Sequence, residues 1–111
     1  MSECTSGAAL LAAAGEVITE RVELGALGVV YARALTAGEF YQGRQRWLSG
    51  QPEGAQLGQA EIVGLCLCDA AGDPLLDDPA ADGGKLPLAV VGRVWPVVAR
   101  LNGFEDDEKN D

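Results

Sequence analysis

The stretch EIVGLCLCDAAGDPLL, residues 61–76, joins the most apolar run of the chain to its most specific turn. Within residues 62–68 only Gly64 lacks an apolar side chain, and such a run is typical of a segment that is covered on all sides. The residues just before it are mostly tolerable helix formers, so we predict a helix of about 12 to 14 residues that ends in this run. We place this helix at the centre of the core.

The turn that follows the apolar run contains strong helix-stopping signals. Gly72 can adopt the left-handed conformation that ends a helix, and Pro74 disfavours helical backbone at Asp73. A calcium loop starting at Asp69 is not expected, because its sixth position would be Pro74 rather than glycine and its twelfth Ala80 rather than glutamate. The aspartates here are therefore predicted to serve turns and helix caps.

Two helices and a β-hairpin are predicted before this segment. A helix over residues 7–14 is followed by a β-hairpin, in which residues 19–24 pair with residues 29–35 across a glycine-containing turn. Thr36 and Glu39 then fit a capping box that starts a helix, and Ser49-Gly50-Gln51-Pro52 is expected to end it.

Two further helices are predicted after the turn. Asp78 and Pro79 suit the start of a short helix, and Pro87 suits the start of a last helix that runs to Leu101 and stops at Asn102-Gly103. The predicted fold is a small, mostly helical α+β single domain with one N-terminal β-hairpin packed on three or four helices. We assign residues 1–104 to this domain and residues 105–111 to an acidic disordered tail.

Composition disfavours several classes of function. The net charge of −9, with eight basic against seventeen acidic residues, makes nucleic acid a poor candidate partner. The longest strictly apolar run, residues 8–14, is far below the ~18 residues of a membrane span, and no basic segment precedes it as in a secretory signal. We therefore expect a cytoplasmic protein that does not bind a membrane.

The cysteines and the absence of histidine bear on chemistry. Two of the three cysteines, Cys66 and Cys68, lie in the apolar run, which favours buried, reduced thiols over a disulfide framework. A zinc site would need about four ligands, and the chain has no histidine and no second cysteine pair. Without histidine the usual general base near neutral pH is missing too, so we predict no metal, no cofactor and no enzymatic activity.

Two apolar surfaces are candidates for binding another protein. Phe40 and Trp47 share a face of the helix that follows Thr36, where they are either ordinary core residues or a partner-binding patch. The apolar arc of the last helix spans about 200°, whereas covering a core needs about 100°. That excess either buries this helix deeply or leaves surface for another chain. The candidate protein-binding residues are Phe40, Trp47, Val90, Val94, Trp95, Val97, Val98 and Leu101.

The order of three motifs resembles the tail assembly chaperones of long-tailed (siphophage-type) bacteriophages. In that family a strand ends in an Arg-x-Leu-Thr step, an apolar helix closes on an Asp-x-x-Gly-x-Pro-Leu-Phe turn, and a Leu-Pro step leads into a final helix ending at Asn-Gly. The matching residues are Arg33, Leu35, Thr36, Asp69, Gly72, Pro74, Leu75, Leu86, Pro87, Asn102 and Gly103. Leu76 stands where the family often has Phe, and residues 80–84 contain glycines where an acidic helix is usual.

The resemblance implies a non-enzymatic protein that binds and solubilises the tape measure protein and promotes polymerisation of the tail tube. It also implies work in the host cytoplasm, absence from the mature virion, possible homo-oligomers, and contact with the tail tube protein through a frameshift-extended form. Glu108-Lys109-Asn110 could be encoded by GAA-AAA-AAC, which contains the slippery run A-AAA-AAC.

A different class of function remains open as the alternative. A small acidic protein can inhibit a host nucleic-acid-binding or defence protein by imitating nucleic acid, which requires carboxylates arrayed on one face. Outside residues 105–111 the acids are scattered through predicted caps and turns. Binding by such a mimic would depend strongly on salt, whereas binding of apolar stripes would not.

Overall fold

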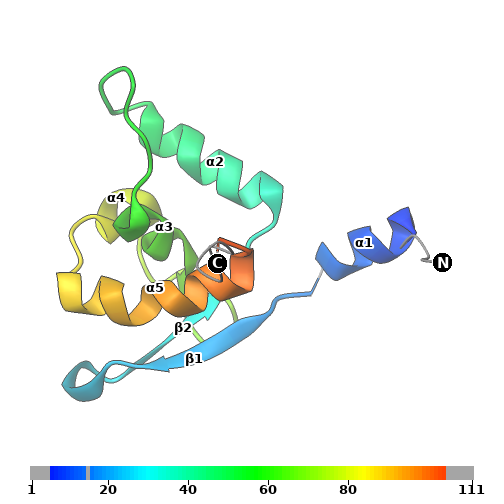
Figure 1. The fold of residues 1–111 in the computed structure, drawn as a ribbon, viewed down its shortest axis with the longest axis horizontal. Helices are drawn as coiled ribbons and strands as arrows, with labels where there is room; N and C mark the ends of the chain where they lie inside the picture. The colour runs from blue at the N-terminus through cyan, green and yellow to red at the C-terminus, as the bar shows by residue number, and fades with distance from the viewer. Residues whose placement is uncertain (1–5, 15, 105–111) are drawn as a thin grey trace, which may run out of the picture.

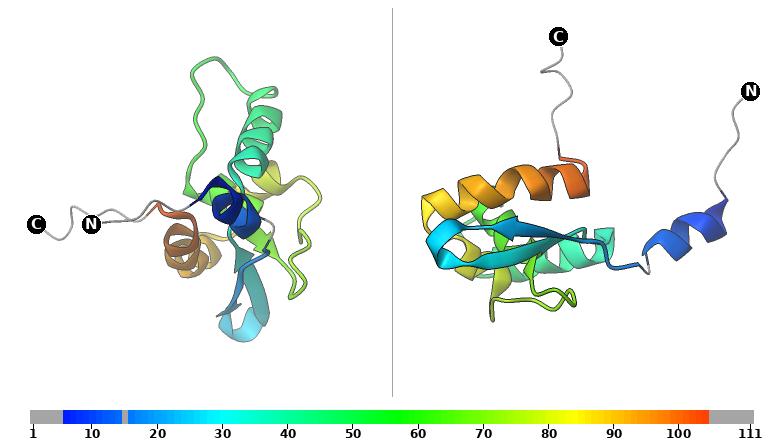
Figure 2. Two further views of the ribbon diagram at one scale, coloured as in Figure 1. Left: turned by 90° about the vertical axis from the view of Figure 1, so that its right-hand side faces the viewer. Right: turned by 90° about the horizontal axis from the view of Figure 1, so that it is seen from below.

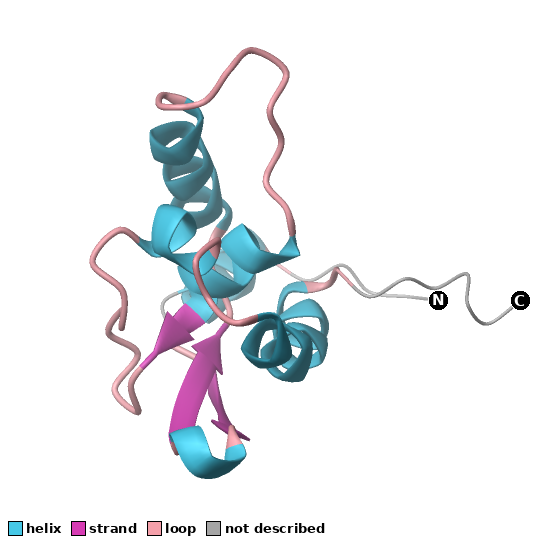
Figure 3. Ribbon diagram, turned by 90° about the vertical axis from the view of Figure 1, so that its left-hand side faces the viewer, coloured by secondary structure: helices cyan, strands magenta, loops and turns pink. Residues whose placement is uncertain are grey.

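The computed structural model describes residues 6–14 and 16–104, and Figure 1 shows its elements in order. They are α1 (Gly7–Ala14), β1 (Thr19–Glu23), the 3-10 turn η1 (Gly25–Leu27), β2 (Val29–Arg33), α2 (Ala37–Leu48), α3 (Gln59–Cys66), β3 (Leu67–Cys68), α4 (Pro79–Gly83) and α5 (Leu88–Asn102). The strands form one antiparallel sheet in the order β1-β2-β3. In Figure 3 the strands gather beneath the longer helices. The predicted α+β single domain is confirmed; the predicted tail, residues 105–111, lies outside the described residues.

The predicted hairpin is confirmed. β1 and β2 pair antiparallel, with Thr19 opposite Arg33 and Glu23 opposite Val29. Gly25 and Gly28 in the turn have φ values of 66° and 96°, which glycine adopts at little cost. The hairpin is therefore closed by its glycines, as the sequence indicates.

The extent predicted for the central helix is wrong at both ends. α3 begins only after Gly58, whose N–H donates to the Glu61 carboxylate at 2.9 Å, and it ends at Cys66. Leu67 takes extended backbone (φ −69°, ψ 131°), and it pairs with Ala32 of β2 as part of β3. A third strand was not predicted. The reason is physical: the buried run satisfies its last backbone groups on the sheet instead of within a longer helix.

The turn after β3 matches the prediction. The Asp69 carboxylate accepts the N–H groups of Ala71 (2.9 Å) and Asp73 (3.0 Å), and Gly72 has φ 92°. Pro74 then forms a bridge with Cys68. The turn lays the following chain along β3, so that edge of the sheet is covered.

The helices α3 and α4 cross at two glycines. A Cβ atom at Gly64 would overlap the Pro79 carbonyl oxygen and approach Gly83 Cα to 2.6 Å. A Cβ atom at Gly83 would in turn overlap the Ala60 carbonyl oxygen. The backbone of α4 occupies the space that a side chain at position 64 would need. This explains why the buried apolar run contains a glycine there.

The short helix α4 begins at Pro79, directly after Asp78, as predicted, but Asp78 does not cap it in the predicted way. The Asp78 carboxylate makes no capping hydrogen bond and instead lies 3.7 Å from Arg46. Asp82 reaches back and accepts the Asp78 N–H at 3.1 Å. The backbone N–H at the start of α4 thus finds its acceptor in the Asp82 carboxylate, four residues further along the chain.

The last helix, α5, is central to the core. Its Val94 and Val98 have no exposed surface, and it packs against α3 and the sheet. The core residues are Val22, Ala32, Val63, Cys66, Leu67, Val90, Val91, Val94 and Val98. The wide apolar arc of α5 thus mainly reflects deep burial, one of the two interpretations left open by the sequence.

The basic side of α5 lies over the free edge of the sheet. The Arg93 guanidinium donates to the Glu23 carbonyl at 3.0 Å, and Arg100 pairs with the Glu20 carboxylate at 2.6 Å. Both acceptors belong to β1. Because an open strand edge invites pairing with other chains, these two contacts protect it.

The first helix, α1, extends away from the rest of the molecule, as Figure 1 and the right view of Figure 2 show. Residues 7–14 form the predicted helix, and the Ser6 hydroxyl accepts the Ala9 N–H at 3.0 Å. The side chains of residues 7–13 are all exposed, with Leu10 at 63% and Leu11 at 77% of full exposure. The apolar helix α1 is thus left in solvent.

Candidate partner-binding surface

A row of aromatic rings joins the start of α2 to the end of α5. Phe40 lies edge-on to Tyr41 with 5.3 Å between ring centroids, and its centroid lies 5.9 Å from that of Phe104. Phe104 stacks on Trp95 at 6.0 Å with an angle of 11° between the planes. Such spacings are favourable for aromatic pairs. The row fixes the relative position of two elements more than fifty residues apart.

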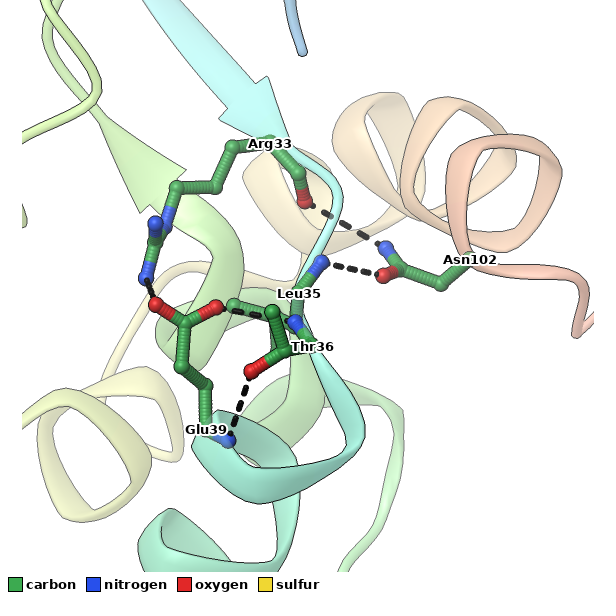
Figure 4. A network of polar contacts seen from close by, with 5 residues as sticks. All are labelled: Arg33, Leu35, Thr36, Glu39 and Asn102. Atoms are coloured by element: carbon green, nitrogen blue, oxygen red, sulfur yellow. Dashed lines mark hydrogen bonds and ion pairs between the residues drawn. The ribbon is translucent and has the colours of Figure 1, made fainter. Parts of the chain in front are cut away.

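The start of α2 is held by the predicted capping box, shown in Figure 4. The Thr36 hydroxyl accepts the Glu39 N–H at 3.1 Å, and the Glu39 carboxylate accepts the Thr36 N–H at 2.9 Å. Arg33 adds an ion pair to Glu39 at 3.2 Å. The backbone hydrogen bond from Thr36, together with the positive charge of Arg33, lowers the pKa of Glu39. The first turn of α2 is therefore a rigid support for Phe40.

Asn102 ties the end of α5 to the link between β2 and α2. Its side-chain oxygen accepts the Leu35 N–H at 2.7 Å, and its amide donates to the carbonyls of Arg33 (3.3 Å) and Val98 (3.0 Å). Figure 4 shows this amide between the two segments. Nothing in the sequence analysis assigned this role to Asn102, which was expected only to help stop the helix.

The chain reversal after α5 places Phe104. Gly103 has φ 76°, and the N–H groups of both Gly103 and Phe104 point to the Ala99 carbonyl. This is the left-handed helix end expected for Asn-Gly, and an apolar contact by the next residue commonly accompanies it. Here that residue is Phe104, which returns to stack on Trp95.

An open groove of about 300 Å³ lies beside the aromatic row. It is lined by Leu35, Thr36, Ala37, Phe40, Tyr41, Asn102 and Phe104, none of which is charged. We call this the aromatic groove. The start of α2 and the end of α5, which contribute most of its lining, lie on the side of the molecule from which α1 projects (Figure 1). In a chain with a net charge of −9, this end of the molecule combines two uncharged apolar features.

The structure places the predicted partner-binding residues in two groups. Val90, Val94 and Val98 are buried in the core of this chain. Phe40, Trp47, Trp95, Val97 and Leu101 are partly exposed. Only Phe40 and Trp95 belong to the aromatic row, and only Phe40 lines the groove.

Four residues of the apolar end were absent from the sequence-based candidates. Tyr41 and Phe104 are 61% and 39% exposed, and Leu10 and Leu11 lie on α1. The signal for Phe104 is its place directly after the Asn-Gly helix end, where an apolar residue usually folds back. The signal for the two leucines is an apolar helix without a polar face.

The two described cysteines, Cys66 and Cys68, are free and buried, as predicted, whereas Cys4 lies outside the described residues. Burial raises the pKa of the Cys66 thiol to about 12 and also raises the pKa of Cys68. The nucleophilic form of cysteine is the thiolate. Both thiols are therefore held in their unreactive form.

A second cavity, of about 320 Å³, lies between α2 and α4. Two arginines reach it, and each is paired with an acid: Arg33 with Glu39, and Arg46 with Asp78. Its charges are thus balanced within the chain. The aromatic groove remains the more apolar place for a protein partner.

Within residues 6–14 and 16–104, no group of three or more potential metal ligands is found, and none of the described helices could cross a membrane. No family model, curated protein or solved structure matches this chain.

Proposed function

We propose that this protein is a non-enzymatic phage tail assembly chaperone, which binds and solubilises the tape measure protein and promotes polymerisation of the tail tube. The observation that supports it best is the pairing of the aromatic groove with the exposed helix α1 at one end of an acidic molecule. The three motifs that resemble the family add the identity of the client. The proposal includes action in the host cytoplasm and absence from the mature virion.

The apolar lining of the aromatic groove indicates a client with exposed apolar side chains. A long helical protein with exposed apolar stripes aggregates unless the stripes are covered, and an apolar groove with aromatic walls can take side chains from such a stripe. The groove offers open aromatic surface from Tyr41 and Phe104. The net negative charge of the chain makes complexes of chain and client repel one another, which opposes aggregation.

The arrangement of the acids does not favour the alternative, an inhibitor that imitates nucleic acid. Glu20, Glu23 and Glu39 each lie in an ion pair with an arginine. Asp69 and Asp82 accept backbone N–H groups in a turn and a helix start. A mimic needs carboxylates free to meet a basic partner.

Co-expression tests the proposal directly. The chain is produced together with the long helical tape measure protein encoded beside it, and the soluble fraction of that client is measured. We expect the client to be soluble only with the chain, and to be lost from the soluble fraction when Tyr41→Asp places a charge in the groove. Leu88→Asp is the matched control, because Leu88 is 85% exposed and does not line the groove. A client that stays insoluble beside the intact chain would refute the function.

The proposed contact with the tail tube protein is tested separately. Contact with the tail tube protein requires the frameshift-extended form, so sequencing the codons for residues 108–110 decides whether the slippery run exists. AAG or AAT in that window would count against a frameshift.

A further inference from the structure

The helix α1 has the properties of a segment that is buried in a complex. Its eight residues, GAALLAAA, carry no charge and only a weak preference for one apolar face. Isolated helices shorter than about 12 to 15 residues are marginal in water, and a helix that is apolar all round is normally buried. The described side chains of α1 are nevertheless exposed. Among the described residues, none covers the leucines of this helix.

The chain that leads from α1 to β1 is attached to the body. The Ile18 carbonyl accepts the Ala34 N–H at 3.0 Å. Val17 packs on the turn, because a Cβ at Gly72 would come within 2.6 Å of its side chain. Only residues 15 and 16 separate this fixed point from the end of α1. So short a connection keeps the arm close to this side of the molecule.

We propose that α1 of one copy docks in the aromatic groove of a second copy, and that the exchange is reciprocal. The arm projects from the side of the molecule where the start of α2 and the end of α5 line the groove (Figure 1), so one two-fold axis on that side lets both arms dock at once. If they lay at opposite ends, the same contact would produce an open chain of copies.

Charge favours a second copy at this end. Two molecules of net charge −9 repel each other wherever acids meet. Residues 6–14 carry no charge, and the residues that line the groove carry none. The exchange therefore joins two acidic molecules through neutral, apolar surfaces.

Size and shape also fit. The groove has a volume of about 300 Å³, which is room for a few aliphatic side chains. Leu10 and Leu11 share one face of α1 with Gly7, since positions three and four residues apart are neighbours on a helix. With Gly7 and the alanines around the two leucines, the helix backbone can come close to Tyr41 and Phe104.

The arm and the proposed client are alternative occupants of the aromatic groove, so the dimer is a state of the chain without client and does not depend on it. A chain that dimerises by arm exchange but fails to solubilise the tape measure protein would refute only the proposed function. A chain that solubilises the client while remaining monomeric at every concentration would refute only the exchange.

Sedimentation velocity over a range of concentrations tests the exchange. We expect the intact chain to form dimers, and we expect Leu11→Asp in the arm and Ala37→Glu in the groove each to give monomers. Ala37 is the first residue of α2, where an added acid is compatible with the helix dipole, so folding is preserved. Leu88→Asp adds the same charge at another exposed leucine and should leave the dimer intact.

Mixing the two defective variants gives the decisive result. The Leu11→Asp chain has an intact groove, and the Ala37→Glu chain has an intact arm, so a mixture at high concentration should form a heterodimer through one contact. Circular dichroism on each variant checks that the fold is unchanged. A monomeric intact chain, a dimer that survives both variants, or a mixture that stays monomeric would each overturn the proposal.

Discussion

The helices α1 and α3 are both eight residues long and both apolar, yet they have opposite surroundings. Val63 and Cys66 of α3 are wholly buried, whereas Leu10 and Leu11 of α1 are largely exposed. The difference is in what surrounds them within this chain: α3 lies among α4, α5 and the sheet, and α1 extends away from the body. Apolarity therefore shows that a helix must be covered, but not whether its own chain covers it.

The largest effect should come from Gly64→Ala in α3. The new methyl group would overlap the Pro79 carbonyl and approach Gly83 Cα to 2.6 Å. Both are backbone atoms of α4, so the two helices must separate, and we expect a loss of about 3 kcal/mol or more in the free energy of unfolding. Denaturant unfolding measures it. A loss below about 1 kcal/mol would show that α4 can move away at little cost.

The next effect should come from Val63→Ala. Val63 has no exposed surface, and removing two methyl groups leaves a cavity between α3 and its neighbours. We expect a loss of about 1 to 4 kcal/mol, as for other buried aliphatic side chains. The comparison is Leu11→Ala in α1, which removes more apolar surface but should change the free energy of unfolding by less than about 0.5 kcal/mol. Equal effects at the two sites would remove the distinction between the helices.

Asn102→Ala should have a somewhat smaller effect. The substitution leaves the Leu35 N–H and the Arg33 carbonyl without their partner, and we expect a cost of about 1 to 3 kcal/mol. Asn102→Asp is the informative control, because it keeps an acceptor for Leu35 but loses the donor to Arg33. If thermal unfolding of the alanine variant matched that of the intact chain, the amide would be dispensable for joining α5 to α2.

These contacts show what sequence patterns can and cannot predict. The capping box of Thr36 and Glu39 and the turn at Gly72 were predicted because each depends on residues close together in the chain. The strand at Leu67 was missed because its partner, Ala32, is far away in sequence. A buried apolar run satisfies either a helix or a sheet, and only the position of β2 decides between them.

The candidate surface was predicted less well than the fold, for a related reason. The apolar arc of α5 could not be divided into core and surface before α3 was placed beside it, and Val94 and Val98 proved to be core. The aromatic groove depends on Phe40 and Phe104 meeting across sixty-four residues. The exposure of α1 depends on how the other described elements are arranged around it, which no local pattern reports.

The stability of the α3 region should also respond to alkaline pH. Because burial raises the pKa of Cys66 from 9.0 to about 12, the folded state keeps a proton that the unfolded state loses above its own pKa. The folded state is therefore destabilised progressively as pH rises from about 9 towards 12. We expect the free energy of unfolding to fall more steeply in the intact chain than in Cys66→Ala. Parallel curves over that range would show that this thiol is not linked to folding.

The smallest effect should come from Gly7→Ala, the counterpart of Gly64→Ala in the other helix. A Cβ at Gly7 meets nothing within 4 Å, and alanine favours a helix over glycine by roughly 1 kcal/mol. This gain in helix stability is confined to α1, because α1 does not pack in the core. We expect the helical signal in circular dichroism to rise slightly at concentrations where the chain is monomeric, while the free energy of cooperative unfolding changes by less than about 0.5 kcal/mol. A rise of a full kcal/mol would instead place α1 in the same cooperative unit as α3. The two glycine substitutions therefore separate a helix that this chain covers from one that it leaves to a partner.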